Sequence, residues 1–403
     1  MIAEPLIMLA LCLVAYSAYS ARLGAGMVSA PMAFMVAGIV TGAGGLGLVS
    51  IDVDSHVLEG FGEITLALIL FADAAGTNAK RLTTDYRIPR RLLLISLPLT
   101  ILLGAVIATF AFPDLSWAEA ALIAAILAPT DAALGLAVVT SPHVPERIRQ
   151  GLLVESGFND GLALPAVLLF AALAYGAEAQ AGQPLSYWLQ FALTQIVIGA
   201  VVGAVLGGAL GKLLVTADDR GWMAHSFRNL ASMGVAILIL FAAHLAGGNG
   251  FIAAFAGGLV FGGFCSKRAG ALTNFVEEEG QLFSLIIFFV FGAALLPAAT
   301  DHFTIVCIAY ALLSLTLIRM LPTWISLTGA NVSLPSTAFI GWFGPRGLAS
   351  ILFLLIAVEH QEMERLSQVE AIVYVTVFFS VMLHGATAAP LSKRLGDRLK
   401  MGD

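Results

Sequence analysis

Long apolar stretches constrain this chain more than any other feature of its sequence. A run of about 20 mainly apolar residues can cross the hydrocarbon core of a bilayer as a helix, and we identify thirteen such runs among the 403 residues. They cover residues 5–21, 30–49, 60–77, 92–112, 116–140, 148–175, 187–215, 226–247, 249–264, 281–298, 303–326, 336–358 and 368–390. The sequence therefore predicts an all-α polytopic membrane protein with about thirteen transmembrane helices.

The composition agrees with a chain that mostly faces lipid. Only 11% of its residues are charged and 59% are hydrophobic, whereas a soluble domain carries about 25% charged residues. So few charges cannot cover a water-facing surface, which excludes a soluble enzyme. The basic residues form no stripe interleaved with aromatics, so no nucleic acid partner is expected. The three cysteines lack metal-ligand spacing, and we expect no cofactor.

The basic residues predict the orientation, because cytoplasmic loops of membrane proteins are enriched in Lys and Arg. Seventeen of the 20 basic residues fall in the odd-numbered predicted loops, at the run ends that border them, or in the C-terminal tail. They are Arg22, Lys80, Arg81, Arg87, Arg90, Arg91, Arg147, Arg149, Lys212, Arg220, Arg228, Lys267, Arg268, Lys393, Arg394, Arg398 and Lys400. We expect an outside N-terminus and a cytoplasmic C-terminus, in the inner or plasma membrane. The first run lacks the basic start of a signal peptide.

Five ionisable residues inside predicted runs indicate an ion site. Asp131 lies in the fifth run, Glu155 and Asp160 in the sixth, and Arg319 and Arg346 in the eleventh and twelfth. An ionised group at the bilayer centre costs at least ~2.5–3.5 kcal/mol, so such residues usually pair or line an aqueous pathway. A salt-bridge network that only holds helices together is the structural alternative.

Two predicted helices contain backbone interruptions, Ala-Pro-Thr-Asp at 128–131 and Gly-Pro-Arg-Gly at 344–347. Proline removes a hydrogen-bond donor, and breaks at membrane depth are tolerated only inside protein or beside a water-filled cavity. Matching broken helices in two halves of a transporter point to its binding site. If runs 1–6 and 8–13 are inverted repeats, these are the fifth helix of each. Asp131 could neutralise the N-terminal helix ends there and Arg346 the C-terminal ends.

The sixth run contains Glu-Ser-Gly-Phe-Asn-Asp-Gly at 155–161. Glu155 and Asn159, and likewise Ser156 and Asp160, are four residues apart, so the four side chains lie on adjoining helix faces. A carboxylate, a hydroxyl and the carbonyls freed near Pro129 are the oxygen ligands that a hard monovalent cation needs.

At these three motifs the sequence resembles the NhaP-type monovalent cation/proton antiporters, of the branch with an Asn-Asp motif, and the likeness covers essentially the whole membrane chain. The resemblance implies a homodimer of a single transmembrane antiporter domain, with two inverted six-helix repeats and broken crossing helices 5 and 12. Repeat one would be 1–175, the linking helix 187–215, repeat two 226–390 and a short cytoplasmic tail 391–403.

The resemblance also implies which residues bind the ion. Asp160 would be the main carboxylate, carrying either the cation or the proton. Thr130 and Ser156 would supply further oxygen ligands to a monovalent cation, and Asp131 would be a carboxylate that shapes the site.

A supporting network is implied as well. Glu155 would pair with an arginine, for which Arg319 is favoured and Arg346 remains the rival, and Asn159 would belong to the same network. Arg346 would be the arginine of the second broken helix.

Together these features predict a secondary active antiporter, with a role in pH homeostasis, that exchanges Na⁺, Li⁺ or K⁺ for H⁺ by alternating access. Deprotonated Asp160 would bind the cation and protonated Asp160 would release it. The three acids and two bases leave one net negative charge, which one cation or one proton neutralises. Exchange is therefore expected to be one for one and electroneutral, as is general among relatives with Asn before the key Asp.

Two other functions are weighed against this one. An ion-coupled symporter of a small organic anion would keep the fold but want a larger, more polar site. An intramembrane aspartyl protease would need a Gly-x-Gly-Asp context that Asp131 and Asp160 lack. It would also leave Glu155 and the two arginines without a role. Two further features are expected to serve packing: His384, and the glycines at 199, 203, 207 and 211, whose spacing allows close helix approach within the chain or in a dimer.

Overall fold

The computed structural model describes residues 3–24, 27–51, 55–76, 86–175, 184–264, 269–358 and 366–400. Within these ranges the chain forms helices and contains no strand. The helices of the first half are α1 (Ala3–Gly24), α2 (Ala30–Thr41), α3 (Ser55–Gly76), α5 (Arg87–Arg91), the π-helix η1 (Leu92–Ser96), α6 (Leu97–Ala111), α7 (Trp117–Ile126), α8 (Ala132–Val139), α9 (Glu146–Tyr175) and α11 (Leu185–Asp219).

The second half is helical in the same way. Its helices are α12 (His225–Leu245), α13 (Gly250–Phe264), α14 (Ala269–Val290), the π-helix η2 (Phe291–Leu295), α15 (Leu296–Ala298), the 3₁₀-helix η3 (Thr300–His302), α16 (Ile305–Leu315), α17 (Leu317–Leu327), α18 (Leu334–Trp342), α19 (Leu348–Val358) and α20 (Leu366–Lys400). Each predicted apolar run overlaps one of these helices or several in succession. The basic residues 80, 81, 267, 268 and 365 lie outside the described residues.

Several helices are suited to a membrane by length and composition. Six in the described part are long and apolar enough to cross one. They cover Arg87–Ala111, Glu146–Ala174, Ser186–Asp219, Glu278–Ala298, Ile305–Leu327 and Leu366–Arg398. Shorter apolar helices, including α2, α7, α13 and much of α19, accompany them.

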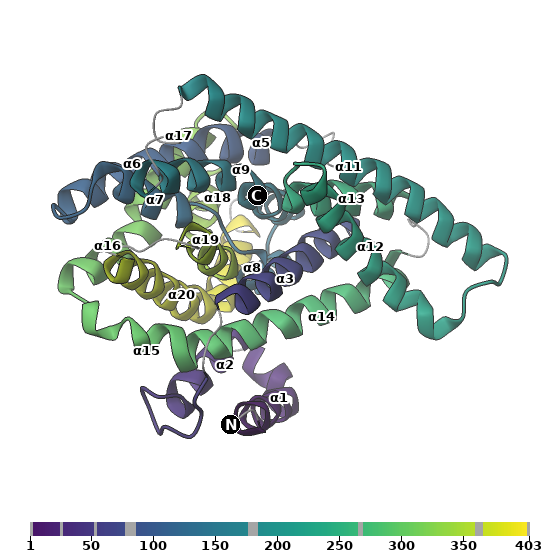
Figure 1. Cartoon of the computed structure of the whole chain (residues 1–403), viewed down its shortest axis with the longest axis horizontal. Helices are drawn as coiled ribbons and strands as arrows, with labels where there is room; N and C mark the ends of the chain where they lie inside the picture. The colour runs from purple at the N-terminus through teal and green to yellow at the C-terminus, as the bar shows by residue number, and fades with distance from the viewer. Residues whose placement is uncertain are drawn as a thin grey trace.

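The helices gather in two groups, with α9 between them (Figure 1). In one group α13 packs against α3, α11 and α12, and α14 packs against α3. In the other group α6, α7, α16, α17, α18, α19 and α20 lie together. Helix α9 contacts α7 in one group and α13 in the other. The helix that carries the 155–161 motif therefore lies where the two groups meet.

The glycines of α11 serve close packing within the chain. A Cβ added at Gly203 or Gly207 would overlap the backbone of α13, at Ala253 and Gly257 respectively, and one at Gly199 would overlap the backbone of Asn249, just before α13. Small residues four apart let two helix backbones approach this closely. The stripe therefore joins α11 to α13 and leaves the opposite face of α11, with Val197, Val201 and Val205, exposed.

Several boundaries differ from the sequence predictions. The helix expected from residue 281 begins at Ala269, and the one expected to end at residue 215 continues to Asp219. The run expected over 30–49 is helical only to Thr41, because Gly42, Gly44, Gly45 and Gly47 follow and Gly47 adopts a φ of +65°. The run over 303–326 is divided at Thr316 into α16 and α17. The thirteenth run was expected to end at Pro390, but α20 continues through that proline to Lys400. Residues 391–400 include Leu, Lys and Arg, which favour helix, so this segment prolongs α20.

Candidate functional site

The two predicted helix interruptions lie against each other in the structure. One is the segment between α7 and α8, and the other is the segment between α18 and α19. The backbone N–H of Asp131 donates to the carbonyl of Pro345 at 2.8 Å. The Ser350 hydroxyl donates to the carbonyl of Ile126, the last residue of α7, at 3.0 Å. Backbone groups freed by one break are thus satisfied by the other.

Asp131 joins the beginnings of two helices. Its Oδ1 accepts from the backbone N–H of Leu134 in α8 at 3.3 Å, and its Oδ2 accepts from that of Leu348 in α19 at 2.6 Å. The first N–H groups of a helix lack partners within it and carry partial positive charge. The buried Asp131 carboxylate therefore caps both half-helices at once.

The glycines of the second interruption permit this close contact. A Cβ at Gly347 would overlap Oδ2 of Asp131, and a Cβ at Gly344 would overlap the Arg319 guanidinium and touch the methyl group of Thr130. A larger residue at either position would push the two broken segments apart. The Gly-Pro-Arg-Gly motif thus combines a break with the space for a second chain segment.

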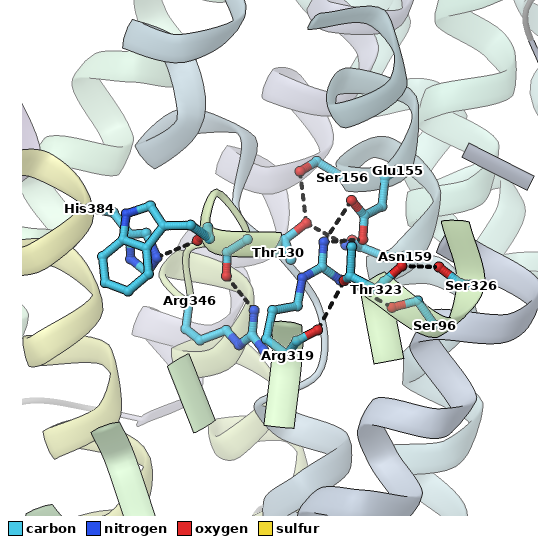
Figure 2. Close-up of polar contacts among 12 residues, drawn as sticks. Ser96, Thr130, Glu155, Ser156, Asn159, Arg319, Thr323, Ser326, Arg346 and His384 are labelled. Atoms are coloured by element: carbon cyan, nitrogen blue, oxygen red, sulfur yellow. Dashed lines mark hydrogen bonds and ion pairs between the residues drawn. The ribbon is translucent and has the colours of Figure 1, made fainter. Parts of the chain in front are cut away.

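A hydroxyl and amide cluster, formed by Thr130, Ser156 and Asn159, joins the first interruption to α9 (Figure 2). The hydroxyls of Thr130 and Ser156 are 3.0 Å apart, and the Asn159 side-chain amide donates to the Thr130 hydroxyl at 2.7 Å. All three residues are buried. The Thr130 hydroxyl therefore connects Ser156 and Asn159 in a buried place.

Asp160 follows this cluster directly on α9. Its residue is 1% exposed. Within the described part of the chain, its Oδ1 and the Oδ1 of Asn159 are buried without a hydrogen-bond partner. A buried polar oxygen usually has a partner, and one that lacks it calls for an ion, a proton or a water molecule. The side-chain amide of Asn159 contacts the Thr130 hydroxyl, and the unpartnered oxygens of Asn159 and of the next residue, Asp160, are candidate ligands for a small cation.

Glu155 and Arg319 form a buried ion pair beside this cluster (Figure 2). Nη2 of Arg319 lies 2.6 Å from Oε1 and 2.8 Å from Oε2 of Glu155. The two side chains are only 2% and 1% exposed, for Glu155 and Arg319 respectively. Among the described residues, Arg319 rather than Arg346 is thus the arginine that contacts Glu155.

Arg346 faces another set of partners. Its Nη1 donates to the carbonyl of Gly344, and its backbone N–H donates to the Ser380 hydroxyl at 2.6 Å. His384, on the same helix as Ser380, lies 2.8 Å by its Nε2 from the carbonyl of Trp342, the last residue of α18. His384 therefore serves packing and capping at the C-terminal end of a half-helix.

The sequence of the chain matches a family of transporters. The family described as "Sodium/hydrogen exchanger, transmembrane" matches residues 7–394. The chain belongs to this family. The sodium/hydrogen exchangers are membrane transporters and not enzymes, which agrees with the helices suited to a membrane and with the site of acids and hydroxyl groups.

Two curated antiporters resemble the chain over most of its length. It is 25% identical over 346 residues to the K(+)/H(+) antiporter NhaP2 of Shewanella sp. (strain ANA-3), which covers 86% of this chain and 58% of that protein. It is 23% identical over 384 residues to the K(+)/H(+) antiporter NhaP of Alkalimonas amylolytica, covering 93% and 63%. The chain thus spans less than two thirds of the length of these curated relatives.

The chain has the same fold as a solved antiporter structure. The sodium proton antiporter MjNhaP1 from Methanocaldococcus jannaschii at pH 8 superposes with a TM-score of 0.79 over 98% of both chains, at 20% identity. This likeness establishes the all-helical fold of the chain as that of an NhaP-type exchanger.

Asn249 is a residue of this site region that the sequence analysis missed. Its Oδ1 accepts from the backbone N–H groups of Phe251 and Ile252 at 3.0 Å each, and its Nδ2 donates to the carbonyl of Gly161 at 3.3 Å. It thereby caps α13 and holds α9 one residue after Asp160. The sequence Gly-Gly-Asn-Gly at 247–250 before an apolar run is a helix-start signal that would have found it.

Glu119 is a further buried acid within a predicted run that the sequence analysis did not count. Its Oε2 accepts from the backbone N–H of Ser116 at 2.7 Å, and its own N–H donates to the Ser116 hydroxyl at 3.2 Å. This reciprocal arrangement is a capping box at the start of α7. Glu119 therefore serves the helix start rather than the candidate site.

Proposed function

We propose that this chain exchanges a monovalent cation for H⁺ across a membrane by alternating access. Family membership and the names of the relatives, which include K⁺/H⁺ and Na⁺/H⁺ antiporters, support this function. K⁺ and Na⁺ are the first cations to consider and Li⁺ the next. The observation that carries the proposal is the buried Asp160, whose Oδ1 has no partner within the described residues.

In this mechanism Asp160 is the group for which the cation and the proton compete. Ionised Asp160 binds the cation with help from the oxygens of Thr130 and Ser156, and protonation of Asp160 releases it. Asp131 shapes the site, and its hydrogen bonds to the starts of α8 and α19 support this role. Only one of the two ligands is bound at a time, so the loaded carrier changes its orientation with either one.

The supporting network keeps this site in place. The Glu155–Arg319 pair holds α9 against α17, and Asn159 orients the Thr130 hydroxyl. Arg346 neutralises the C-terminal end of α18. The buried contacts of these residues support the roles.

The larger organisation is part of the same proposal. The chain is a single antiporter domain of thirteen transmembrane helices, in two inverted repeats linked by residues 187–215, and it works as a homodimer. Its N-terminus lies outside, and residues 391–403 lie in the cytoplasm. The cell's inner or plasma membrane is the site of action, and control of cytoplasmic pH is the role.

The test is proton movement in proteoliposomes that contain the purified chain and an internal pH dye. Addition of K⁺, Na⁺ or Li⁺ should move protons, while choline should not. Asp160→Asn should abolish the response because this nearly isosteric change removes the titratable group. Glu370→Gln, which removes a half-buried acid of α20, is the matched control and should retain the response. A folded, unmodified chain that responds to none of the three cations would refute antiport.

A further inference from the structure

A groove between α18 and α20 lies outside the candidate ion site. Its volume is about 260 Å³. From α18 it is lined by residues including Pro335, Phe339 and Trp342, and from α20 by residues including Arg394, Leu395 and Arg398. On each helix the lining positions follow the spacing i, i+3, i+4 and i+7, so each helix contributes a single face.

The two helices run antiparallel along the groove, which gives it a polar end and an apolar end. The indole N–H of Trp342 donates to the Thr387 hydroxyl at 2.9 Å, so the end of α18 lies beside the middle of α20. From there α18 leads back to Pro335 while α20 leads on to Arg398. The groove therefore has an apolar inner end at Trp342 and a basic outer end at the start of α18.

The basic end has charge to offer. Arg394 and Arg398 are exposed, and no ion pair or hydrogen bond ties either guanidinium to another described residue. The N-terminus of the nine-residue α18 adds partial positive charge. The floor between the arginines is apolar because Phe339 and Leu395 form it. These two side chains are 7% and 4% exposed.

Other basic side chains reach the same end of the molecule. Arg91 donates to the carbonyl of Thr328 at 2.5 Å, and Arg147 donates to that of Asn331 at 3.4 Å, just before α18 begins. Lys and Arg mark the cytoplasmic side of a membrane protein, and the lipid leaflet on that side carries anionic head groups. Basic pockets between helices at this level suit such lipids.

We propose that the groove binds one anionic phospholipid. Arg394 and Arg398 hold its head-group phosphate, and one acyl chain lies over Phe339 and Leu395 toward Trp342. Guanidinium groups bind phosphate through paired, charge-assisted hydrogen bonds. Trp342 ends α18 directly before the Gly344–Gly347 break. The bound acyl chain therefore also stabilises α18, the half-helix next to the candidate ion site. This last step rests on the proposed transport function, whereas lipid binding does not.

The binding test uses the purified full-length chain, stripped of lipid, and native mass spectrometry with phosphatidylglycerol or phosphatidylcholine. The unmodified chain should bind one phosphatidylglycerol in preference to phosphatidylcholine. An arginine near an anionic lipid contributes about fivefold in affinity. The double variant Arg394→Gln/Arg398→Gln should therefore lose this preference on the order of tenfold or more.

Two further variants separate the groove from general surface charge. Arg87→Gln/Arg90→Gln removes the same charge from two exposed positions of α5 that do not line the groove, and should keep the preference. Ala338→Trp fills the groove, which Ala338 also lines, and should displace the lipid without changing charge. Equal losses in the two double variants, or unchanged binding in Ala338→Trp, would overturn the proposal.

A transport measurement addresses the second step. In proteoliposomes with and without phosphatidylglycerol, lipid-dependent exchange in the unmodified chain should disappear in Arg394→Gln/Arg398→Gln and persist in Arg87→Gln/Arg90→Gln. Lipid-independent exchange would overturn the coupling to α18. Selective lipid binding by a chain that exchanges no cation would uphold the groove and refute the antiporter function, so the two failures are distinguishable.

Discussion

The Glu155–Arg319 pair should be worth more to the folded chain than any other pair of charges at the site. Either partner alone would be an uncompensated charge in a buried place, because the two side chains are 2% and 1% exposed. Breaking a buried pair by removing one partner typically costs ~3–5 kcal/mol. Glu155→Leu and Arg319→Leu should each destabilise the chain by about this amount.

The double variant decides whether the pair itself is responsible. Replacing both residues by apolar ones leaves no unpaired charge. In other proteins, such a replacement of a buried ion pair often leaves stability unchanged or raises it. Glu155→Leu/Arg319→Leu should therefore lose at least ~3 kcal/mol less than the sum of the two single variants. Because arginine is larger than leucine, Arg319→Leu leaves a cavity, and the double variant keeps the part of the stability loss that this cavity causes.

The assay is thermal unfolding in detergent, compared at one heating rate because membrane proteins commonly unfold irreversibly. At about 2–4 °C per kcal/mol, each single variant should unfold on the order of 10 °C below the unmodified chain. Asp160→Asn, which breaks no ion pair of the described structure, should lose less. Additive losses in the double variant, or stronger coupling of Glu155→Leu with Arg346→Leu, would refute the assignment of the pair.

Three other changes test the rest of the site. Asp131→Ala leaves the N–H groups of Leu134 and Leu348 without the Asp131 carboxylate, which should cost about 1–3 kcal/mol for each. Asp131→Asn keeps one acceptor oxygen, so in the same thermal unfolding assay it should lose about half as much stability. It should still impair exchange. Asn249→Ser keeps a capping hydroxyl but cannot reach Gly161, so exchange in proteoliposomes should fall while the melting temperature changes little; an unchanged rate would show that this contact does not position α9. An imposed membrane potential without an ion gradient should drive no cation uptake if exchange is electroneutral, and potential-driven accumulation of K⁺ or Na⁺ would contradict the charge count.

Much of this fold could be predicted because the bilayer imposes simple rules. Apolar runs of fixed length indicated the helices, and prolines at 129 and 345 indicated the breaks. The all-helical membrane architecture and the family are confirmed. The roles of the eight candidate residues stay predictions, although the structure brings most of them into direct contact.

The remaining features depend on contacts that no local pattern contains. The preference of Glu155 for Arg319 over Arg346 depends on which helix packs against α9, and Asn249 acts through a carbonyl 88 positions away. The division of a predicted helix at Thr316 had no proline or glycine beside it to announce the break. Glu119 was overlooked for another reason, since its capping pattern lay within an apolar run.

The contacts that close the site have a consequence for biosynthesis. The contact of Asp131 with Leu348 can form only after 217 further residues have been synthesised. The contact of Glu155 with Arg319 needs 164 further residues. At about 5–20 residues per second, a ribosome needs roughly 10–40 s to make the longer stretch. During that time Asp131 lacks its contact with α19, and for most of it Glu155 lacks its arginine. The site is therefore completed late in synthesis. A truncated chain that ends before Leu348 should leave the site incomplete and should be degraded by the proteases that remove incomplete membrane proteins.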